Sequence, residues 1–191
     1  RLGKHAELRS TEPAALASSR LAGCYPLEPY TGRLGYRRFR WRGQDHSTQP
    51  TFDDNPASVH GVPWQPPWTV TAATATEATC EYRHAADAHW PFAFTLRQRY
   101  VLTPDTLELH LAFTNDAAEA QPVGLGWHPY FPKRTRSRIH AELTQRRGER
   151  LPERPHEGAA VARGAGEDPF ELHAVARRVV VVVVHRGHRR A

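Results

Sequence analysis

The sequence predicts an all-β protein, and more specifically an antiparallel β-sandwich. Apolar and polar side chains alternate with a period of two along residues 92–102 and 106–114, as in strands with one buried face. Gly, Pro, Asn and Asp separate the strand-like segments, and no segment shows a convincing amphipathic helical pattern. A length of 191 residues suits one domain. Strand following strand with turn residues between them is typical of a sandwich.

The elements expected before residue 92 are one weak helix and three strands. Residues 11–20 are weakly helical, with a possible capping threonine at the start. Residues 36–42 alternate as a strand does, and residues 43–45 would follow as a turn. Residues 68–74 and 78–83 are expected to pair as a hairpin.

The clearest strands lie between residues 92 and 114. Residues 92–102 and 106–114 are joined by a Thr-Pro-Asp turn at 103–105, which predicts an antiparallel hairpin. The apolar face of the second strand comprises Leu107, Leu109, Leu111 and Phe113. A run of six valines at 179–184 has the β-branched composition of one further strand.

Charge and aromatic residues divide the chain into two parts. Residues 1–131 hold 12 Lys/Arg against 13 Asp/Glu, and residues 132–191 hold 14 against 7, so the net charge of +6 comes from the last third. Only one aromatic residue, Phe170, lies beyond residue 131. We therefore expect a partial sandwich domain over residues 1–144 and a basic, poorly ordered tail over residues 145–191. Because no aromatic rings interleave with the tail's arginines, we expect no nucleic-acid partner.

The composition excludes several classes of protein. Hydrophobic residues make up 39% and charged residues 24%, which are ordinary values for soluble chains. The valine run at 179–184 is far shorter than the roughly 20 residues that cross a bilayer, so we expect no membrane partner. Two cysteines and no visible leader predict a reduced, cytoplasmic setting. The absence of methionine, even at position 1, leads us to expect a piece of a longer protein.

Two histidines lie in loops with aromatic neighbours. His60 sits in a polar loop at 53–61, and His128 stands in the segment Gly-Leu-Gly-Trp-His-Pro-Tyr-Phe at 124–131. The aromatic residues close to them in sequence are Trp64, Trp68, Trp127 and Tyr130. Aromatic faces beside hydrogen-bonding side chains suit a sugar, which has apolar C–H faces and a polar rim. This hypothesis requires two imidazoles, 68 positions apart in the chain, to face one carbohydrate cleft.

Three sequence blocks together resemble aldose 1-epimerase, also called galactose mutarotase. The first is Cys-Tyr-Pro-Leu-Glu-Pro-Tyr at 24–30, followed by Gly-Arg at 32–33. The second is Val-His-Gly at 59–61, and the third is the segment at 124–131. The resemblance covers roughly residues 8–140. It implies a β-supersandwich, of which this chain would hold an incomplete part, and interconversion of the α and β anomers of an aldose.

The resemblance also implies roles for individual residues. His128 matches the histidine that protonates the sugar ring oxygen, and His60 matches a second histidine that binds and polarises the sugar. Arg33 and Asn55 match residues that contact sugar hydroxyls. The residues themselves, apart from the resemblance, add three aromatic side chains expected to bind the sugar: Trp64, Trp127 and Tyr130. An imidazole with an ordinary pKa near ~6.5 suits proton exchange near neutrality, and no metal, nucleotide or redox cofactor is expected.

Some family features have no match in this sequence. The family's basic glutamate and an upstream aspartate are not found, and Gly32 stands where the family usually has asparagine. We therefore expect an isomerase of the aldose 1-epimerase type that acts on a free aldohexose with impaired activity. The residues leave open a non-catalytic sugar-binding module, or a hexose-6-phosphate epimerase relative that uses arginines 37, 38 and 40. Neither the preferred sugar nor the oligomeric state follows from the sequence.

Overall fold

The computed structural model describes residues 8–9, 11, 19–53, 55–104 and 106–132, and the backbone of residues 178–185. The elements in chain order, with η for a 3-10 helix, are η2 (Ser19–Leu21), β1 (Cys24–Pro26), β2 (Arg33–Leu34), η3 (Gly35–Arg37), β3 (Arg38–Trp41), β4 (Gln44–Ser47), β5 (Ser58–Val59), β6 (Thr69–Ala73), β7 (Glu77–His84), β8 (Phe94–Leu102), β9 (Thr106–Asn115), β10 (Trp127–Pro129) and β11 (Arg178–His185). The predicted all-β, antiparallel class is confirmed. In the described part of the chain, no helix has the length and apolar content needed to cross a membrane.

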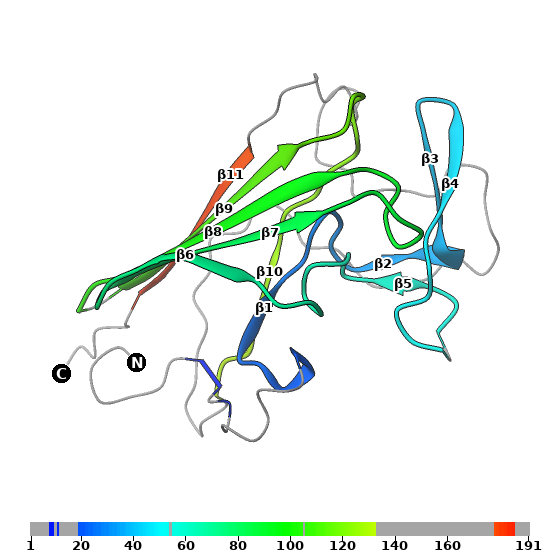
Figure 1. The fold of residues 1–191 in the computed structure, drawn as a ribbon. Helices are drawn as coiled ribbons and strands as arrows, with labels where there is room; N and C mark the ends of the chain where they lie inside the picture. The colour runs from blue at the N-terminus through cyan, green and yellow to red at the C-terminus, as the bar shows by residue number, and fades with distance from the viewer. Residues whose placement is uncertain are drawn as a thin grey trace, which may run out of the picture.

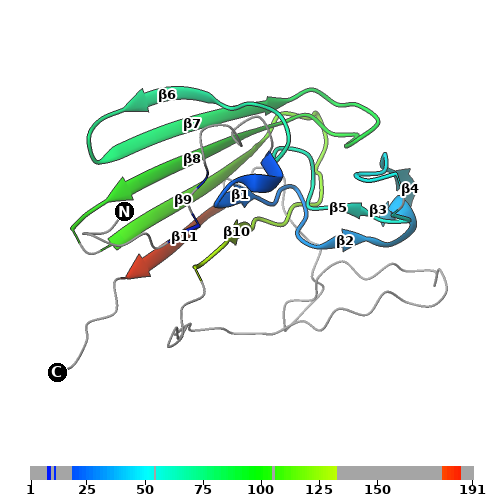
Figure 2. The same cartoon turned by 90° about the horizontal axis from the view of Figure 1, so that it is seen from below.

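The largest sheet contains five strands in the order β11-β9-β8-β7-β6, and each neighbouring pair is antiparallel. Figure 1 shows this sheet as a long twisted layer, with β1 and β10 running below it. Three further two-stranded sheets pair β1 with β10, β2 with β5, and β3 with β4. In Figure 2, seen from below, the β3–β4 hairpin lies beyond the end of the large sheet.

The predicted hairpins of the large sheet are confirmed. β8 and β9 pair continuously, from Phe94 opposite Asn115 to Leu102 opposite Leu107. The Thr103 backbone N–H closes the turn by donating to the Thr106 carbonyl at 2.9 Å. β6 and β7 also pair as expected, with one register shift within β6.

The core lies where the predicted apolar faces of β8 and β9 meet rings from the preceding loops. Phe94 and Phe113 are fully buried and stack with ring centroids 5.0 Å apart. Phe39 of β3 stacks on Trp90 at 4.9 Å, which joins the β3–β4 hairpin to the sheet. Stacked aromatic pairs of this kind add to the stabilisation from burial alone.

The prediction for residues 36–42 is wrong at both ends. Tyr36 and Arg37 have positive φ values of 54° and 59°, so the backbone turns there and the strand begins at Arg38. The predicted turn at residues 43–45 is also displaced. Arg42 and Gly43, at φ 48° and 80°, form a two-residue hairpin loop of the kind that suits twisted strands. Gln44 and Asp45 therefore belong to β4.

Parts of the predicted helix and tail fall outside the described residues. Of residues 11–20, the structure describes Thr11 and the start of η2 only. In the tail, Arg178–His185 forms β11 and pairs with β9, in agreement with a strand over the valine run. The expected disorder of the rest of the tail stays a prediction.

Glu28 lies where three segments of the chain meet. Its carbonyl accepts the Val62 N–H at 3.1 Å, and the residue forms an isolated parallel bridge with Gly61. Its side-chain carboxyl accepts the backbone N–H of Gly126. Glu28 therefore joins residues 58–62 to residues 124–130, the two segments that carry the predicted histidines.

The Glu28 carboxyl is itself a buried acid. The residue is only 1% exposed, and Oε2 has no hydrogen-bond partner among the described residues. Burial raises the pKa of this carboxyl well above its usual value, against the smaller opposite effect of the Gly126 N–H. The acid therefore holds its proton at a pH where the unfolded chain has lost it.

Replacement of Gly61 by alanine tests how closely these segments pack. A Cβ at Gly61 would lie 1.6 Å from the Glu28 carbonyl oxygen, and φ is +70°. Gly43 has a similar φ of +80°, but its Cβ would meet nothing within 4 Å. We expect G43A to lower the free energy of unfolding by about 1 kcal/mol. G61A should cost about 4 kcal/mol or prevent folding, because the backbone has to move. Urea denaturation measures both variants, and equal losses would contradict the close packing.

The buried acid should also give stability a specific pH dependence. Between pH 4.5 and the raised pKa, folded Glu28 binds a proton that the unfolded chain does not, so its contribution to stability falls as pH rises. We expect Glu28→Gln to remove this fall, so that E28Q gains on the parent chain with rising pH by up to about 1.4 kcal/mol per pH unit. Urea denaturation from pH 4.5 to 8 measures the difference. The matched control is E119Q at an exposed carboxyl, and parallel curves for E28Q and the parent chain would refute the prediction.

Candidate functional site

The structure brings His60 and His128 together. Their ring centroids are 5.5 Å apart, and the planes meet edge to face at 78°. His60 follows β5, which pairs with β2, while His128 lies in β10, which pairs with β1. Both partner strands belong to one short stretch of chain, so residues 24–34 hold the two histidine segments side by side.

His128 packs against two tyrosine rings. Tyr25 lies directly across the β1–β10 ladder from it, with ring centroids 4.8 Å apart. Tyr130, two residues further along and therefore on the same side of the chain, stacks on His128 at 4.7 Å. The two phenol oxygens are 2.9 Å apart and share a hydrogen bond. These contacts fix the position of the His128 ring.

His60 adopts a backbone conformation that is rare for a residue with a side chain. Its φ is +66°, and its backbone N–H donates to the Gly32 carbonyl at 2.9 Å. The Gly32 N–H donates in return to His60 Nδ1 at 3.3 Å. Because Nδ1 accepts a hydrogen bond, the neutral ring carries its proton on Nε2. In its neutral form, His60 is thus a hydrogen-bond donor through Nε2.

The phenol of Tyr25 is held in its protonated form. Burial raises its pKa to about 12, and the hydrogen bond with Tyr130 adds to the effect. At neutral pH the hydroxyl can therefore donate or accept a hydrogen bond, but it is a poor general base.

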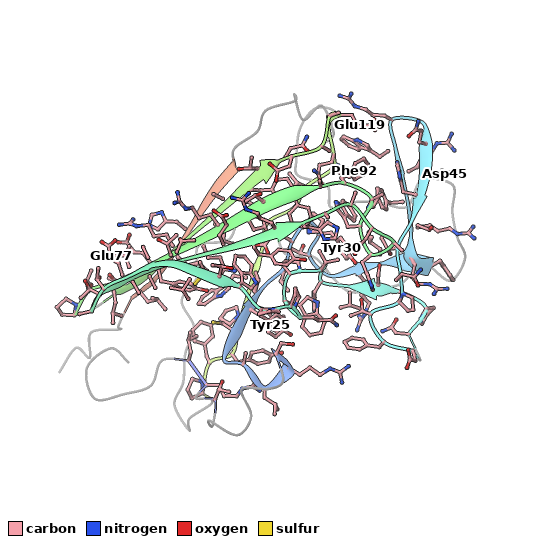
Figure 3. All side chains as sticks on the ribbon, in the orientation of Figure 1. Tyr25, Tyr30, Asp45, Glu77, Phe92 and Glu119 are labelled. Atoms are coloured by element: carbon pink, nitrogen blue, oxygen red, sulfur yellow. The ribbon has the colours of Figure 1, made fainter. Side chains whose placement is uncertain are left out.

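Trp64 extends the aromatic cluster from Tyr25. The two ring centroids are 5.5 Å apart, and Phe52 follows at 6.1 Å from Trp64. Trp64 is 6% exposed, and its indole N–H has no hydrogen-bond partner among the described residues. We call His60, His128, Tyr25, Tyr130 and Trp64 the histidine face. In Figure 3, the labelled Tyr25 lies below the large sheet, well away from Glu77 at its tip.

The other predicted site residues lie in different settings. Arg33 lies opposite Val59 in the β2–β5 ladder, and Val59 directly precedes His60 in the chain. Asn55 accepts the Ala57 N–H at 2.9 Å through its side chain, which is a local turn contact. Trp127 precedes His128 in β10, so its side chain points to the opposite side of the strand. Its indole N–H lies against the Cys24 thiol.

Sequence reasoning did not select Tyr25, Phe52 or Arg9 as site residues. The Arg9 guanidinium lies 4.2 Å from the centroid of the Tyr130 ring. Tyr25 belongs to the first of the three blocks that carry the family resemblance, at residues 24–30, but its pairing with His128 spans more than 100 residues. No local pattern predicts a contact between segments so far apart in sequence.

Comparisons with known proteins identify the family of the chain. A family model described as aldose 1-epimerase matches residues 8–152. The chain is 34% identical over 123 residues to YphB, an uncharacterized protein of Escherichia coli K12, covering 64% of this chain and 41% of YphB. YihR, another uncharacterized E. coli K12 protein, is 28% identical over 105 residues, covering 54% of this chain and 34% of YihR.

A solved structure shares the fold. The crystal structure is of an E. coli K12 protein that carries the provisional name of an aldose 1-epimerase. It matches with a TM-score of 0.59 and 32% identity, over 66% of this chain and 42% of that one. The chain thus spans about two fifths of the length of these relatives. Because the family model covers most of the sequence, the chain belongs to the aldose 1-epimerase family.

Proposed function

We propose that the histidine face binds an aldohexose and that its chemistry is the interconversion of α and β anomers by acid–base ring opening. One observation carries this proposal: His60 and His128 lie 5.5 Å apart, centroid to centroid, among aromatic rings. A pyranose presents apolar C–H faces that suit Tyr25 and Trp64, and ring and hydroxyl oxygens that suit the imidazoles. Membership of the aldose 1-epimerase family supports the same reaction class.

The two histidines take different parts in the proposed reaction. His60, with its proton on Nε2, donates a hydrogen bond to a sugar oxygen near the ring. Protonated His128 gives its proton to the ring oxygen as the bond from that oxygen to C1 breaks. A base removes the proton of the C1 hydroxyl, which becomes the aldehyde. Rotation about C1–C2, followed by the reverse proton transfers, closes the ring as the other anomer.

The base is the part of this reaction that the described residues do not supply. Among the described residues, no carboxylate forms a hydrogen bond or ion pair with His128 or Tyr25, and the Glu28 carboxyl is buried. Tyr25, with its pKa raised to about 12, is not a base at neutral pH. General acid–base steps typically contribute about 10²–10⁴-fold each, so we expect slow turnover from this chain. This same observation favours a second candidate, a sugar-binding module without catalysis.

Arg33 and Asn55 complete the proposed site as hydroxyl contacts, and no metal or redox cofactor enters the reaction. The assignment of Trp127 to the sugar rests on the sequence alone, since its indole lies against Cys24. Both cysteines are free, and we propose a cytoplasmic setting on the basis of cysteine content.

Replacement of His128 tests the catalytic proposal. We expect His128→Ala to reduce the mutarotation rate above buffer by about 10²–10⁴-fold, because the ring oxygen loses its proton donor. Polarimetry on freshly dissolved α-glucose and α-galactose measures the rate. His89→Ala, at an exposed loop residue, is the matched control. A parent chain that binds sugar but shows no rate above buffer would leave the binding module as the function.

Replacement of Trp64 tests where the sugar binds. We expect added sugar to change the intrinsic tryptophan fluorescence, and Trp64→Phe to remove most of this change, because Trp64 lies beside Tyr25 at 5.5 Å. Trp68→Phe is the control, since that indole donates to the Pro63 carbonyl and packs on Tyr82. If W64F kept the full fluorescence change, the sugar would bind away from the histidine face.

A further inference from the structure

Glu28 holds the two histidine segments with different atoms. Its carbonyl oxygen accepts the Val62 N–H at 3.1 Å, and Val62 follows His60 by two residues. Its carboxyl accepts the Gly126 N–H, and Gly126 precedes His128 by two residues. A movement of Glu28 would therefore shift the segments that carry both imidazoles.

The carboxyl adds to a contact that the backbone has already formed. The Leu27 N–H donates to the Gly126 carbonyl at 2.9 Å, and the Gly124 N–H donates to the Pro29 carbonyl at 2.6 Å. The Gly126 N–H takes no part in these two bonds, and the Glu28 carboxyl accepts it. Of the three bonds, this one depends on a side chain, so a substitution can remove it while the backbone partners remain.

Packing alone gives no reason for an acid at this position. Glu28 is 1% exposed, and its Oε2 has no hydrogen-bond partner among the described residues. A buried polar atom without a partner destabilises the folded state, whereas an apolar side chain of similar size would fill the same space without that cost. A carboxyl that persists in such a place indicates a role beyond filling space.

The titratable groups near the carboxyl are themselves acids. Burial raises the pKa of Tyr100 in β8, and the nearby Cys24, Cys80 and Glu28 groups add to the effect. Burial raises the pKa of the Cys24 and Cys80 thiols as well. At neutral pH these neighbours are therefore uncharged, and they supply no positive charge to an ionised Glu28.

The basic groups of the described residues have other partners or lie elsewhere. No lysine, arginine or histidine in the described part of the chain forms an ion pair with Glu28. The rings of His60 and His128 contact each other and Tyr25. An ionised Glu28 would thus remain a buried charge with the Gly126 N–H as its described hydrogen-bond donor.

We infer that Glu28 is a positioning residue of the histidine face, and that it holds His60 and His128 together only while its carboxyl carries a proton. The inference rests on the contacts of Glu28, and its consequence for sugar binding rests on the proposed function. Loss of the proton leaves a charge on a buried carboxyl, and the charge draws the side chain toward water. The Gly126 contact then breaks, and the His128 segment moves relative to His60.

The direction of the pH dependence follows from the surroundings of the carboxyl. Burial outweighs the Gly126 hydrogen bond and raises the pKa of Glu28 well above its usual value. The contact is therefore complete below this raised pKa and is lost as pH rises through it. Titration of the two histidines occurs whether or not residue 28 can ionise, so a comparison with a variant that cannot ionise isolates Glu28.

The nuclear Overhauser effect between ring C–H groups of His60 and His128 tests the inference in the 191-residue chain without a ligand, since the ring centroids lie 5.5 Å apart. We expect the parent chain to show this signal at pH 6 and to lose at least about half of it by pH 9. Glu28→Gln keeps an acceptor oxygen and cannot ionise, so E28Q should keep the signal throughout. Glu28→Leu has no acceptor and should show a weaker signal at both pH values. E119Q, at an exposed carboxyl, is the matched control and should follow the parent chain.

Fluorescence titration with glucose at the same pH values tests the consequence for the proposed site. The apparent affinity of a ligand falls in proportion to the fraction of chains that are competent to bind it. We expect the apparent Kd of the parent chain to rise about tenfold from pH 6 to pH 9 and the Kd of E28Q to change by less than about twofold.

Each outcome decides the inference. An E28L chain with the full histidine signal at pH 6, or the same pH dependence in the parent chain and E28Q, overturns the positioning role. A signal that is lost only together with the far-UV circular dichroism of the folded chain overturns it too. The expected histidine signals without saturable glucose binding at any pH support the positioning role and overturn the proposed function. If E28L does not fold, the comparison of the parent chain with E28Q decides.

Discussion

The antiparallel pairing of β1 with β10 is the interaction on which the histidine face depends. It places Tyr25 opposite His128, and the same stretch of chain then passes through Glu28 to β2, which holds the His60 segment. A shift of one residue in this ladder would turn His128 to the other side of the strand and exchange it with Trp127. The buried contacts of Glu28 with Gly61, Val62 and Gly126 oppose such a shift.

Backbone strain and buried polar atoms without described partners occur together around the histidine face. His60 has a positive φ, and Glu28 and Trp64 each leave a buried polar atom without a described partner. Each feature costs on the order of 1–3 kcal/mol in isolation. Such costs persist when surrounding packing fixes the conformation, and they are frequent at functional sites. The same β5–β2 pairing that strains His60 also presents Gly32 to its Nδ1, so the strained backbone sets the tautomer of the ring.

Local sequence patterns predicted the strands of the large sheet, but they did not predict the strand pairing that brings the two histidines together. The period-two alternation in β8 and β9 depends on neighbouring residues only, and it gave both the strands and their buried faces. The same reasoning was wrong at Tyr36 and Arg37, where positive φ values that no alternation reveals delay the start of the strand to Arg38. The three blocks around Arg33, His60 and His128 indicated one site through family resemblance, whereas Tyr25 and Arg9 become part of it only through long-range contacts.

Net charge is a poor guide to the charge that a ligand meets. The first 131 residues are nearly neutral in sum, and the excess of arginine lies in the last third of the sequence. Yet Arg9 and Arg20 lie against the aromatic cluster without acidic partners among the described residues, and burial raises the pKa of the Glu28 carboxyl well above its usual value. A balanced count alone does not give the charge at one site, because potential depends on where charges lie and how well solvent screens them. The tail's charge, although larger, says nothing about this site.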